Sequence, residues 1–320
     1  MPSILVVGAG ELGTAVLAAL SSHPQRRRGS NDTNKLAVLR RAETLNSPSP
    51  ATQAELARFT STFGATSETG DFVDSPIPDL VAVFKRYDVV IQCGGFGKPP
   101  GTQLRVTQAV LEARVKRYFP WQFGVDYDAI GQGSQQELFD EQLAVRNMLR
   151  GQKATEWTIV STGMFMSFLF RAAEGGVVDV EKRAVTALGS WGNRVTVTTP
   201  EDIGTMVAEL VYEPREDTGV VFISGETVEY GELADLLDRL YASGGGDDGK
   251  WKRELFDQDY LKKRLEEEAE DLALKYMSVF AAGVGVSWDL ETTVNYQRGI
   301  RLTRLEEFVR ENRRSLGLGE

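Results

Sequence analysis

Residues 4–20 constrain this chain more than any other stretch. They begin with Ile-Leu-Val-Val at residues 4–7, a run typical of a strand buried on both faces. Gly8, Gly10 and Gly13 then interrupt the apolar pattern, which resumes with helical period. Glycines at G-x-G-x-x-G spacing between a strand and a helix indicate a dinucleotide-binding turn, although an ordinary βα turn that binds no ligand has the same elements.

Each glycine of this turn has its own physical task. Gly8 makes the turn, Gly10 lets a pyrophosphate approach the backbone, and Gly13 lets the helix pack against the strand. The N–H groups at the helix start then face the anionic ligand, which the helix dipole also favours. We therefore expect Glu11 and Leu12, together with the three glycines, to bind a pyrophosphate.

Composition excludes several other kinds of protein. The formal net charge of −10 repels nucleic acid and anionic membranes, and no apolar run approaches the ~20 residues of a membrane span. The single cysteine, Cys93, and the single histidine, His23, leave no basis for a disulfide, a metal site or histidine catalysis. No targeting segment is visible, so we expect a cytoplasmic monomer or homodimer without metal, nucleic-acid or membrane partners.

The second predicted strand, Leu36–Leu39, ends in Arg40 and Arg41. An acidic residue here would bind a ribose 2′-hydroxyl, whereas an arginine pairs with a 2′-phosphate, to which Thr44 can add a hydroxyl. A charge-assisted hydrogen bond contributes about 1.5–3 kcal/mol, which predicts a roughly ten- to hundred-fold preference for NADP(H) over NAD(H). The alternative is two arginines at a solvated strand end.

Two further loops are predicted on the cofactor side. The loop with Asp71 and Phe72 follows a short strand and is a candidate adenine-side loop. The buried strand Asp88–Cys93 opens into Gly94-Gly95-Phe96-Gly97, where three of four residues lack a side chain. Such a loop lets the backbone approach a cofactor closely.

The succession of about six βα-like units predicts an α/β fold with a Rossmann-type doubly wound parallel sheet. We expect residues 1–162 to form an NADP(H)-binding domain and residues 163–320 a smaller C-terminal α/β substrate-binding region, interleaved with the Rossmann core. Helices are expected over Gln135–Leu149 and Leu261–Tyr276.

A segment dense in aromatic and sulfur side chains, with Met164, Phe165 and Phe168, follows the strand Trp157–Ser161. Because it starts at the carboxyl end of a parallel strand, it is a candidate substrate-pocket lining. The alternative is a buried core segment.

These motifs resemble the NmrA-like branch of atypical short-chain dehydrogenases, which includes isoflavone, pinoresinol-lariciresinol and phenylcoumaran benzylic ether reductases. The overall sequence pattern is most similar to that of the fungal isoflavone-reductase-like oxidoreductases. Besides the glycine turn, the resemblance rests on Leu39–Arg41, Gly70–Phe72, Val115–Gly124, Ala144–Arg146 and Ile159–Phe165.

The resemblance implies NADPH as hydride donor, with the three glycines on the pyrophosphate and Arg40 on the 2′-phosphate. It also implies an aromatic or conjugated small-molecule substrate. The residues implied along the ribose and nicotinamide are Gly94, Gly95, Phe96, Phe119 and Pro120. The candidate substrate contacts are Trp121, Phe123, Met164, Phe165 and Phe168.

Two departures from the family pattern concern catalysis. The family's Pro-Ser-Glu-Phe-Gly has Trp121 and Gln122 at its second and third positions here, and the catalytic lysine of the plant reductases aligns with Gln142. A glutamine can orient a carbonyl or a water but cannot donate a proton at neutral pH. The proton is then expected from Tyr127, with Lys98 or solvent as alternatives. The competing interpretation of Tyr127 is a surface aromatic residue in a polar loop.

The sequence therefore predicts an NADPH-dependent reductase of an aromatic or conjugated small molecule, of the isoflavone- or benzylic-ether-reductase type. The alternative, favoured by the missing lysine, is a non-catalytic NADP(H)-sensing regulatory protein.

Overall fold

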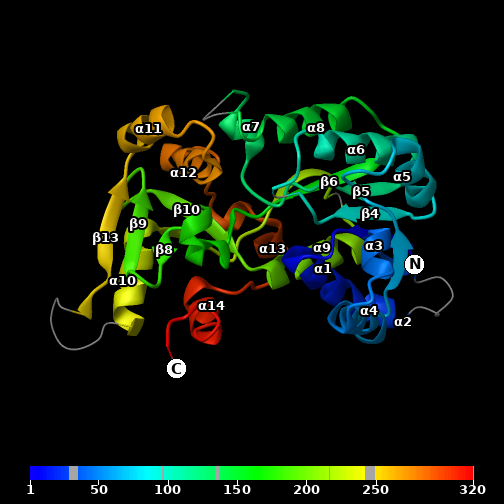
Figure 1. The fold of residues 1–320 in the computed structure, drawn as a ribbon, viewed down its shortest axis with the longest axis horizontal. Helices are drawn as coiled ribbons and strands as arrows, with labels where there is room; N and C mark the ends of the chain where they lie inside the picture. The colour runs from blue at the N-terminus through cyan, green and yellow to red at the C-terminus, as the bar shows by residue number, and fades with distance from the viewer. Residues whose placement is uncertain (29–34, 96, 134–136, 216, 242–248, 320) are drawn as a thin grey trace. The chain divides into compact units, whose positions relative to one another are not determined.

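A computed structural model describes residues 1–28, 35–95, 97–133, 137–215, 217–241 and 249–319. By their internal contacts these residues form two compact units, each built from separate stretches of the chain (Figure 1). Unit 1 comprises Met1–Phe123, Glu141–Val160 and Pro200–Val221, and unit 2 comprises Gly124–Asp140, Ser161–Thr199 and Phe222–Glu320. The sequence prediction places a boundary after residue 162, with the C-terminal region interleaved with the Rossmann core; the two compact units exchange segments on both sides of that point.

Unit 1 is organised around one seven-stranded sheet. Its strands are β1 (Ile4–Val7), β2 (Leu36–Arg40), β3 (Thr66–Thr69), β4 (Val89–Gln92), β5 (Arg117–Phe119), β6 (Glu156–Ser161) and β11 (Gly219–Phe222). They pair in the order β11-β6-β5-β4-β1-β2-β3, and β1 to β6 run parallel. The strand order reverses at β1, which confirms the predicted Rossmann-type doubly wound fold.

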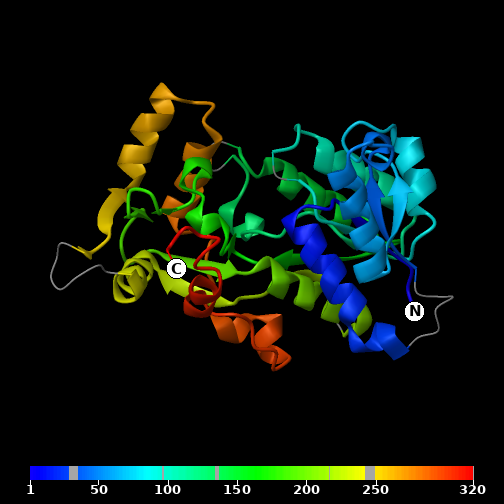
Figure 2. The ribbon, with the colours of Figure 1, turned by 60° about the horizontal axis from the view of Figure 1, so that its bottom comes forward.

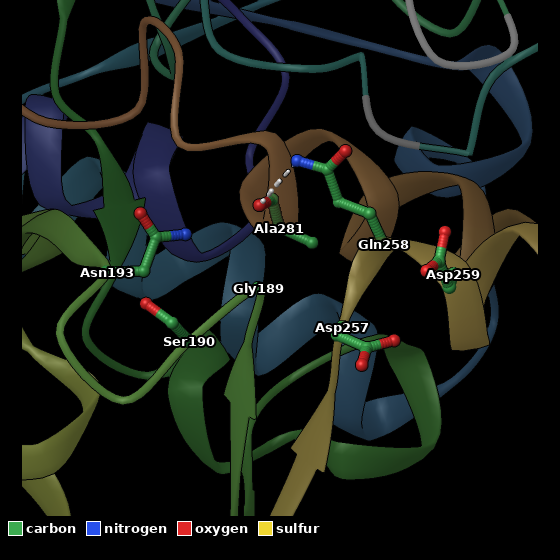
Figure 3. A pocket seen from close by; sticks show the side chains of 7 residues that line it. All are labelled: Gly189, Ser190, Asn193, Asp257, Gln258, Asp259 and Ala281. Atoms are coloured by element: carbon green, nitrogen blue, oxygen red, sulfur yellow. Dashed lines mark hydrogen bonds between the residues drawn. The ribbon is translucent and has the colours of Figure 1, made fainter.

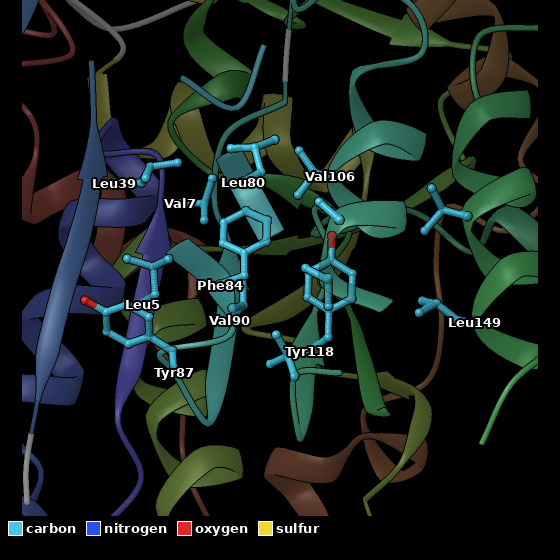
Figure 4. Packing of buried hydrophobic residues seen from close by; sticks show 14 of the residues in the cluster. Leu5, Val7, Leu39, Leu80, Phe84, Tyr87, Val90, Val106, Tyr118 and Leu149 are labelled. Carbon is cyan, nitrogen blue, oxygen red and sulfur yellow. The ribbon is translucent and has the colours of Figure 1, made fainter. Parts of the chain in front are cut away.

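Helices cover both faces of this sheet (Figure 1). They are α1 (Glu11–Ser22), α2 (Pro24–Arg28), α3 (Ala42–Leu45), α4 (Pro50–Phe63), α5 (Ile77–Phe84), α6 (Thr102–Glu112), α8 (Asp140–Arg150) and α9 (Pro200–Tyr212). On one face, α5, α6 and α8 close over a core that includes Leu5, Phe84 and Leu149 (Figure 4). On the other face α1 and α9 lie side by side (Figure 2). A Cβ atom on Gly204 would lie only 2.6 Å from the carbonyl oxygen of Ala15.

Unit 2 contains two small mixed sheets, ordered β12-β10-β7 and β13-β9-β8. Its strands are β7 (Met164–Phe165), β8 (Val178–Asp179), β9 (Ala184–Leu188), β10 (Arg194–Thr198), β12 (Glu226–Glu229) and β13 (Lys252–Phe256). Its α-helices are α7 (Tyr127–Ile130), α10 (Tyr230–Tyr241), α11 (Gln258–Glu267), α12 (Leu272–Ala282), α13 (Val294–Gln297) and α14 (Leu305–Glu311). No helix in the described part of the chain has the length and apolar character to cross a bilayer.

Two predicted helices have different limits in the structure. The helix expected over Gln135–Leu149 begins only at Asp140, and residues 135 and 136 lie outside the described part. The single helix expected over Leu261–Tyr276 is wrong, because α11 ends at Glu267 and α12 begins at Leu272. Asp271 caps α12 by accepting a hydrogen bond from the N–H of Leu274 at 2.9 Å, so this acidic residue starts a new helix.

Candidate functional site

The glycine turn after β1 is built by contacts that leave no room for side chains. Gly8 has φ +102°, and a Cβ atom there would lie 2.8 Å from the backbone nitrogen of Gly94, in the turn after β4. A Cβ atom on Gly13 would lie 2.0 Å from the carbonyl oxygen of Gly8. The turns after β1 and β4 and the first turn of α1 are therefore packed backbone against backbone, at the point where the strand order reverses.

Gly10 is different, because a Cβ atom there would meet nothing within 4 Å. Gly10 is the exposed N-cap residue of α1 and, as a glycine, has no side chain of its own at the helix start. Open space beside a glycine at a helix N-terminus fits the pyrophosphate that the motif predicts.

The register of β1 with β2 pairs Val7 with Leu39 and so brings Arg40 level with the glycine turn. Arg40 is only 7% exposed, and its guanidinium carbon lies 4.2 Å above the ring centre of Phe59 on α4. Nη1 lies 3.5 Å from Oε1 of Glu55, while Nε and Nη2 are buried and have no hydrogen-bond partner among the residues that the structure describes. Burial lowers the pKa of Arg40, and the Glu55 carboxylate partly offsets this.

Two unpaired donors on a buried guanidinium fit a ligand with an anionic group, because a buried N–H without a partner is costly. The predicted alternative, two arginines at a solvated strand end, is wrong for Arg40. It describes Arg41, which is exposed at the N-cap of α3. Thr44 is half-buried in α3.

The loop with Asp71 and Phe72 has an internal hydrogen bond and also packs against the glycine turn after β4. Oδ1 of Asp71 accepts a hydrogen bond from the N–H of Val73 at 2.9 Å, which stabilises the turn and engages that carboxylate oxygen. The Phe72 ring lies beside Gly94, where a Cβ atom would be 2.8 Å from the ring. Phe72 therefore borders the same glycine loop that a cofactor would approach.

The second glycine of that loop lies against an indole. A Cβ atom on Gly95 would be 2.1 Å from the Trp121 ring, so this position needs glycine. Phe119 is fully buried and Pro120 is buried in this structure. Phe96 lies outside the described residues.

Gln142 lies on α8 in unit 1 and is 7% exposed. The backbone carbonyl oxygen of Gln142 accepts a hydrogen bond from Nε2 of Gln122 at 2.9 Å. Oε1 of Gln122 in turn accepts one from Nε of Arg146 at 2.9 Å. The side-chain oxygen of Gln142 is buried and has no hydrogen-bond partner within the described ranges of the chain. Gln122, which stands where the family has a glutamate, therefore holds the backbone at Gln142. The side-chain oxygen of Gln142 can still accept a hydrogen bond from a ligand.

Glu141 cannot replace the missing lysine. Its Oε1 accepts hydrogen bonds from the backbone N–H groups of Gln103 at 2.6 Å and Leu104 at 3.2 Å, at the start of α6. A carboxylate in this position stabilises the helix N-terminus.

Sequence reasoning missed a buried polar chain in unit 1. Tyr118 donates to Oε1 of Gln92 at 2.5 Å, and Nε2 of Gln92 donates to Oε1 of Gln103 at 2.6 Å and to the carbonyl of Gly94 at 3.4 Å. This chain links the glycine loop to β5 and α6. The available signal was Gln92 itself, a polar residue at the end of an otherwise apolar strand.

The remaining predicted residues belong to unit 2, except for Lys98, which is exposed, and Trp121 and Phe123; these three are in unit 1. Tyr127 is 3% exposed, so the interpretation as a surface aromatic is wrong; its ring centre lies 5.0 Å from that of Phe139. Phe168 is half-buried, with its ring centre 5.1 Å from that of Tyr276, a contact that sequence reasoning missed. Met164 is fully enclosed in β7, as the core alternative predicts, and Phe165 is half-buried.

A cavity of about 480 Å³ in unit 2 includes none of these residues. As Figure 3 shows, polar side chains border it, among them Asn193, Asp257 and Asp259. Carboxylates and amides at its edge do not suit an aromatic ligand.

The fold and the glycine turn define a Rossmann-type α/β protein. Within that class the chain belongs to the NmrA-like family, whose sequence profile matches residues 2–242. An NmrA-like family domain-containing oxidoreductase from Gibberella moniliformis is 47% identical over 310 residues, covering 97% of each chain. An isoflavone reductase homolog from Solanum tuberosum is 27% identical over 74% of this chain and 76% of its own length.

Solved structures share the fold. A leucoanthocyanidin reductase–NADPH complex from Vitis vinifera superposes with a TM-score of 0.75 at 17% identity, covering 97% of this chain and 98% of its own. AtPrR2 with NADP+ and (+)pinoresinol gives a TM-score of 0.73 at 18% identity, with the same coverage.

Proposed function

We propose that this protein is an NADPH-dependent reductase of an aromatic or conjugated small molecule. The structural observation that supports the cofactor most directly is Arg40, a buried guanidinium with two unpaired donors level with the glycine turn. The oxidoreductase relative at 47% identity supports the reaction class, and reductase relatives with aromatic substrates support the substrate class. A monomeric or dimeric state and a cytoplasmic location stay predictions.

The cofactor, when bound, supplies a hydride to an electrophilic carbon of the substrate. Gly8, Gly10 and the first N–H groups of α1 would hold the pyrophosphate, and Arg40 the 2′-phosphate. The Gln142 amide, which is buried and has an unused oxygen, would orient a donor group of the ligand but not protonate it. We assign the proton to the Tyr127 phenol, with Lys98 or solvent as the other sources.

Purified protein tests this proposal directly. NADPH consumption is followed with a panel of quinones, enones, imines and benzylic ethers, with NADH as the paired cofactor. Turnover with NADPH on at least one of these classes is expected. No consumption across the panel would contradict the reductase.

The second candidate, a protein that binds NADP(H) without turnover, is favoured by Gln142 in place of a lysine. In that case NADP(H) would bind with no turnover, and a partner protein would be captured only in its presence.

A further inference from the structure

Arg40 has a neighbouring carboxylate that the sequence prediction did not include. Oε1 of Glu55, on α4, lies 3.5 Å from Nη1 of Arg40. The Glu55 side chain is 49% exposed, whereas that of Arg40 is 6% exposed. A strong charge-assisted hydrogen bond is shorter, at about 2.7–2.9 Å. The pair is therefore weak and has one partner that can turn into solvent.

The rest of the Arg40 side chain is held in place without Glu55. Its guanidinium carbon lies 4.2 Å from the ring centre of Phe59, a residue that is 1% exposed, so the position of the positive charge does not depend on the ion pair alone. Nε and Nη2 are buried, and no group in the described part of the chain forms a hydrogen bond with them. An anion that binds this guanidinium would find its donors already positioned.

We propose that Glu55 determines cofactor specificity by competing with the 2′-phosphate of NADP(H) for Arg40. This inference rests on the proposed NADPH dependence. In the free protein the Glu55 carboxylate partly neutralises a buried cation. A 2′-phosphate beside Arg40 repels this carboxylate, and its exposed side chain can move away. NAD(H) has no group that displaces it, so the competition lowers affinity for the phosphorylated cofactor alone.

The substitution Glu55→Gln tests this competition, because it removes the charge and keeps the shape. Binding of NADP+, NAD+, adenosine 2′,5′-bisphosphate and AMP is measured by calorimetry at low ionic strength. We expect NADP+ and the bisphosphate to bind about two- to five-fold more tightly, since a half-exposed ion pair contributes little, and NAD+ and AMP to bind unchanged.

Glu43→Gln is the matched control. Glu43 is exposed on α3, also near the end of β2, and its substitution removes the same charge, but among the described residues Arg40 pairs with Glu55 and not with Glu43. This control should leave all four affinities unchanged. In an Arg40→Met background, Glu55→Gln should lose its effect on NADP+.

The outcomes separate the two proposals. A wild-type protein that binds neither dinucleotide, or prefers NAD+, contradicts the proposed function. A wild-type preference for NADP+ that Glu55→Gln leaves unchanged or weakens overturns the competition alone. The same holds if Glu43→Gln tightens NADP+ equally, or if the Glu55 effect persists without Arg40.

Discussion

A Cβ atom on Gly13 would lie 2.0 Å from the carbonyl oxygen of Gly8, so α1 can pack at the end of β1 only without a side chain there. Gly10, three residues earlier, has no such neighbour within 4 Å. The protein itself therefore requires Gly13, whereas only a ligand would require Gly10.

Alanine substitutions separate these two requirements. Gly13→Ala should lower the free energy of unfolding by about 1–3 kcal/mol or more, because the methyl group overlaps backbone. Gly10→Ala should cost less than about 1 kcal/mol, the difference between glycine and alanine as a helix N-cap. It should nevertheless weaken NADP+ binding by about ten-fold or more, because the methyl group occupies the space that the pyrophosphate needs. Urea unfolding and NADP+ titration check both variants; undiminished NADP+ affinity in Gly10→Ala would contradict the assigned site.

Arg40→Asp should reduce NADPH affinity by roughly ten-fold or more and change NADH affinity little, since only NADPH carries the group that pairs with the guanidinium. Fluorescence titration with both cofactors measures this. Equal losses for the two cofactors would remove the basis for a 2′-phosphate site.

Gly204→Ala should destabilise unit 1 by about 1–3 kcal/mol, because a Cβ atom in α9 would lie 2.6 Å from the carbonyl oxygen of Ala15 in α1. Gly192→Ala is the control, since a Cβ atom at that exposed position meets nothing within 4 Å. Urea unfolding curves compare the two variants with the wild type. Equal stability of both variants would mean that α1 and α9 pack less closely than described.

Acid should destabilise the fold through Asp88. Burial opposes its ionisation, but Lys116 at 2.6 Å and hydrogen bonds from Ser3 outweigh it and lower the pKa of Asp88 to about 2. A folded pKa below the unfolded value stabilises the protein above pH ~4, and this contribution is lost as the pH falls from ~4 to ~2. Because the Asp88 side chain is 32% exposed and that of Lys116 is 80% exposed, solvent screens the pair and the contribution is about 1 kcal/mol. Asp88→Asn should reduce stability at pH 7 by that amount and flatten the profile between pH 2 and 4; a profile as steep as the wild type's would assign the acid sensitivity elsewhere.

Gln142→Lys should raise NADPH-dependent turnover of substrates that need a proton, such as benzylic ethers. An amide cannot donate one at neutral pH, whereas a buried ammonium has a lowered pKa and donates more readily. Gln142→Met, which has similar size and no proton, serves as the control. If the lysine and methionine variants behave alike, position 142 has no part in protonation.

The sheet and the glycine turn could be predicted from the sequence, because both depend on local signals, namely runs of branched apolar residues and the spacing of glycines. Arg40 could also be identified from the sequence as a candidate residue, because it ends the strand that lies next to the glycine motif. Its contacts with Phe59 and Glu55 could not be predicted, because they depend on how α4 packs on the sheet. The break between α11 and α12 was missed for a local reason: the acidic run has helical propensity throughout, and only the Asp271 side chain marks the new start.

The place of α9 in unit 1 affects how the chain can be made. Val16, Leu17 and Leu20 of α1 are buried in the finished protein, and the helix beside them, α9, is not synthesised until residue 212. Residues 1–162 therefore leave the ribosome before α9 exists, so the apolar stripe of α1 stays uncovered until residues 200–212 have been synthesised. A fragment expressed only to residue 162 would keep that stripe exposed and should precipitate.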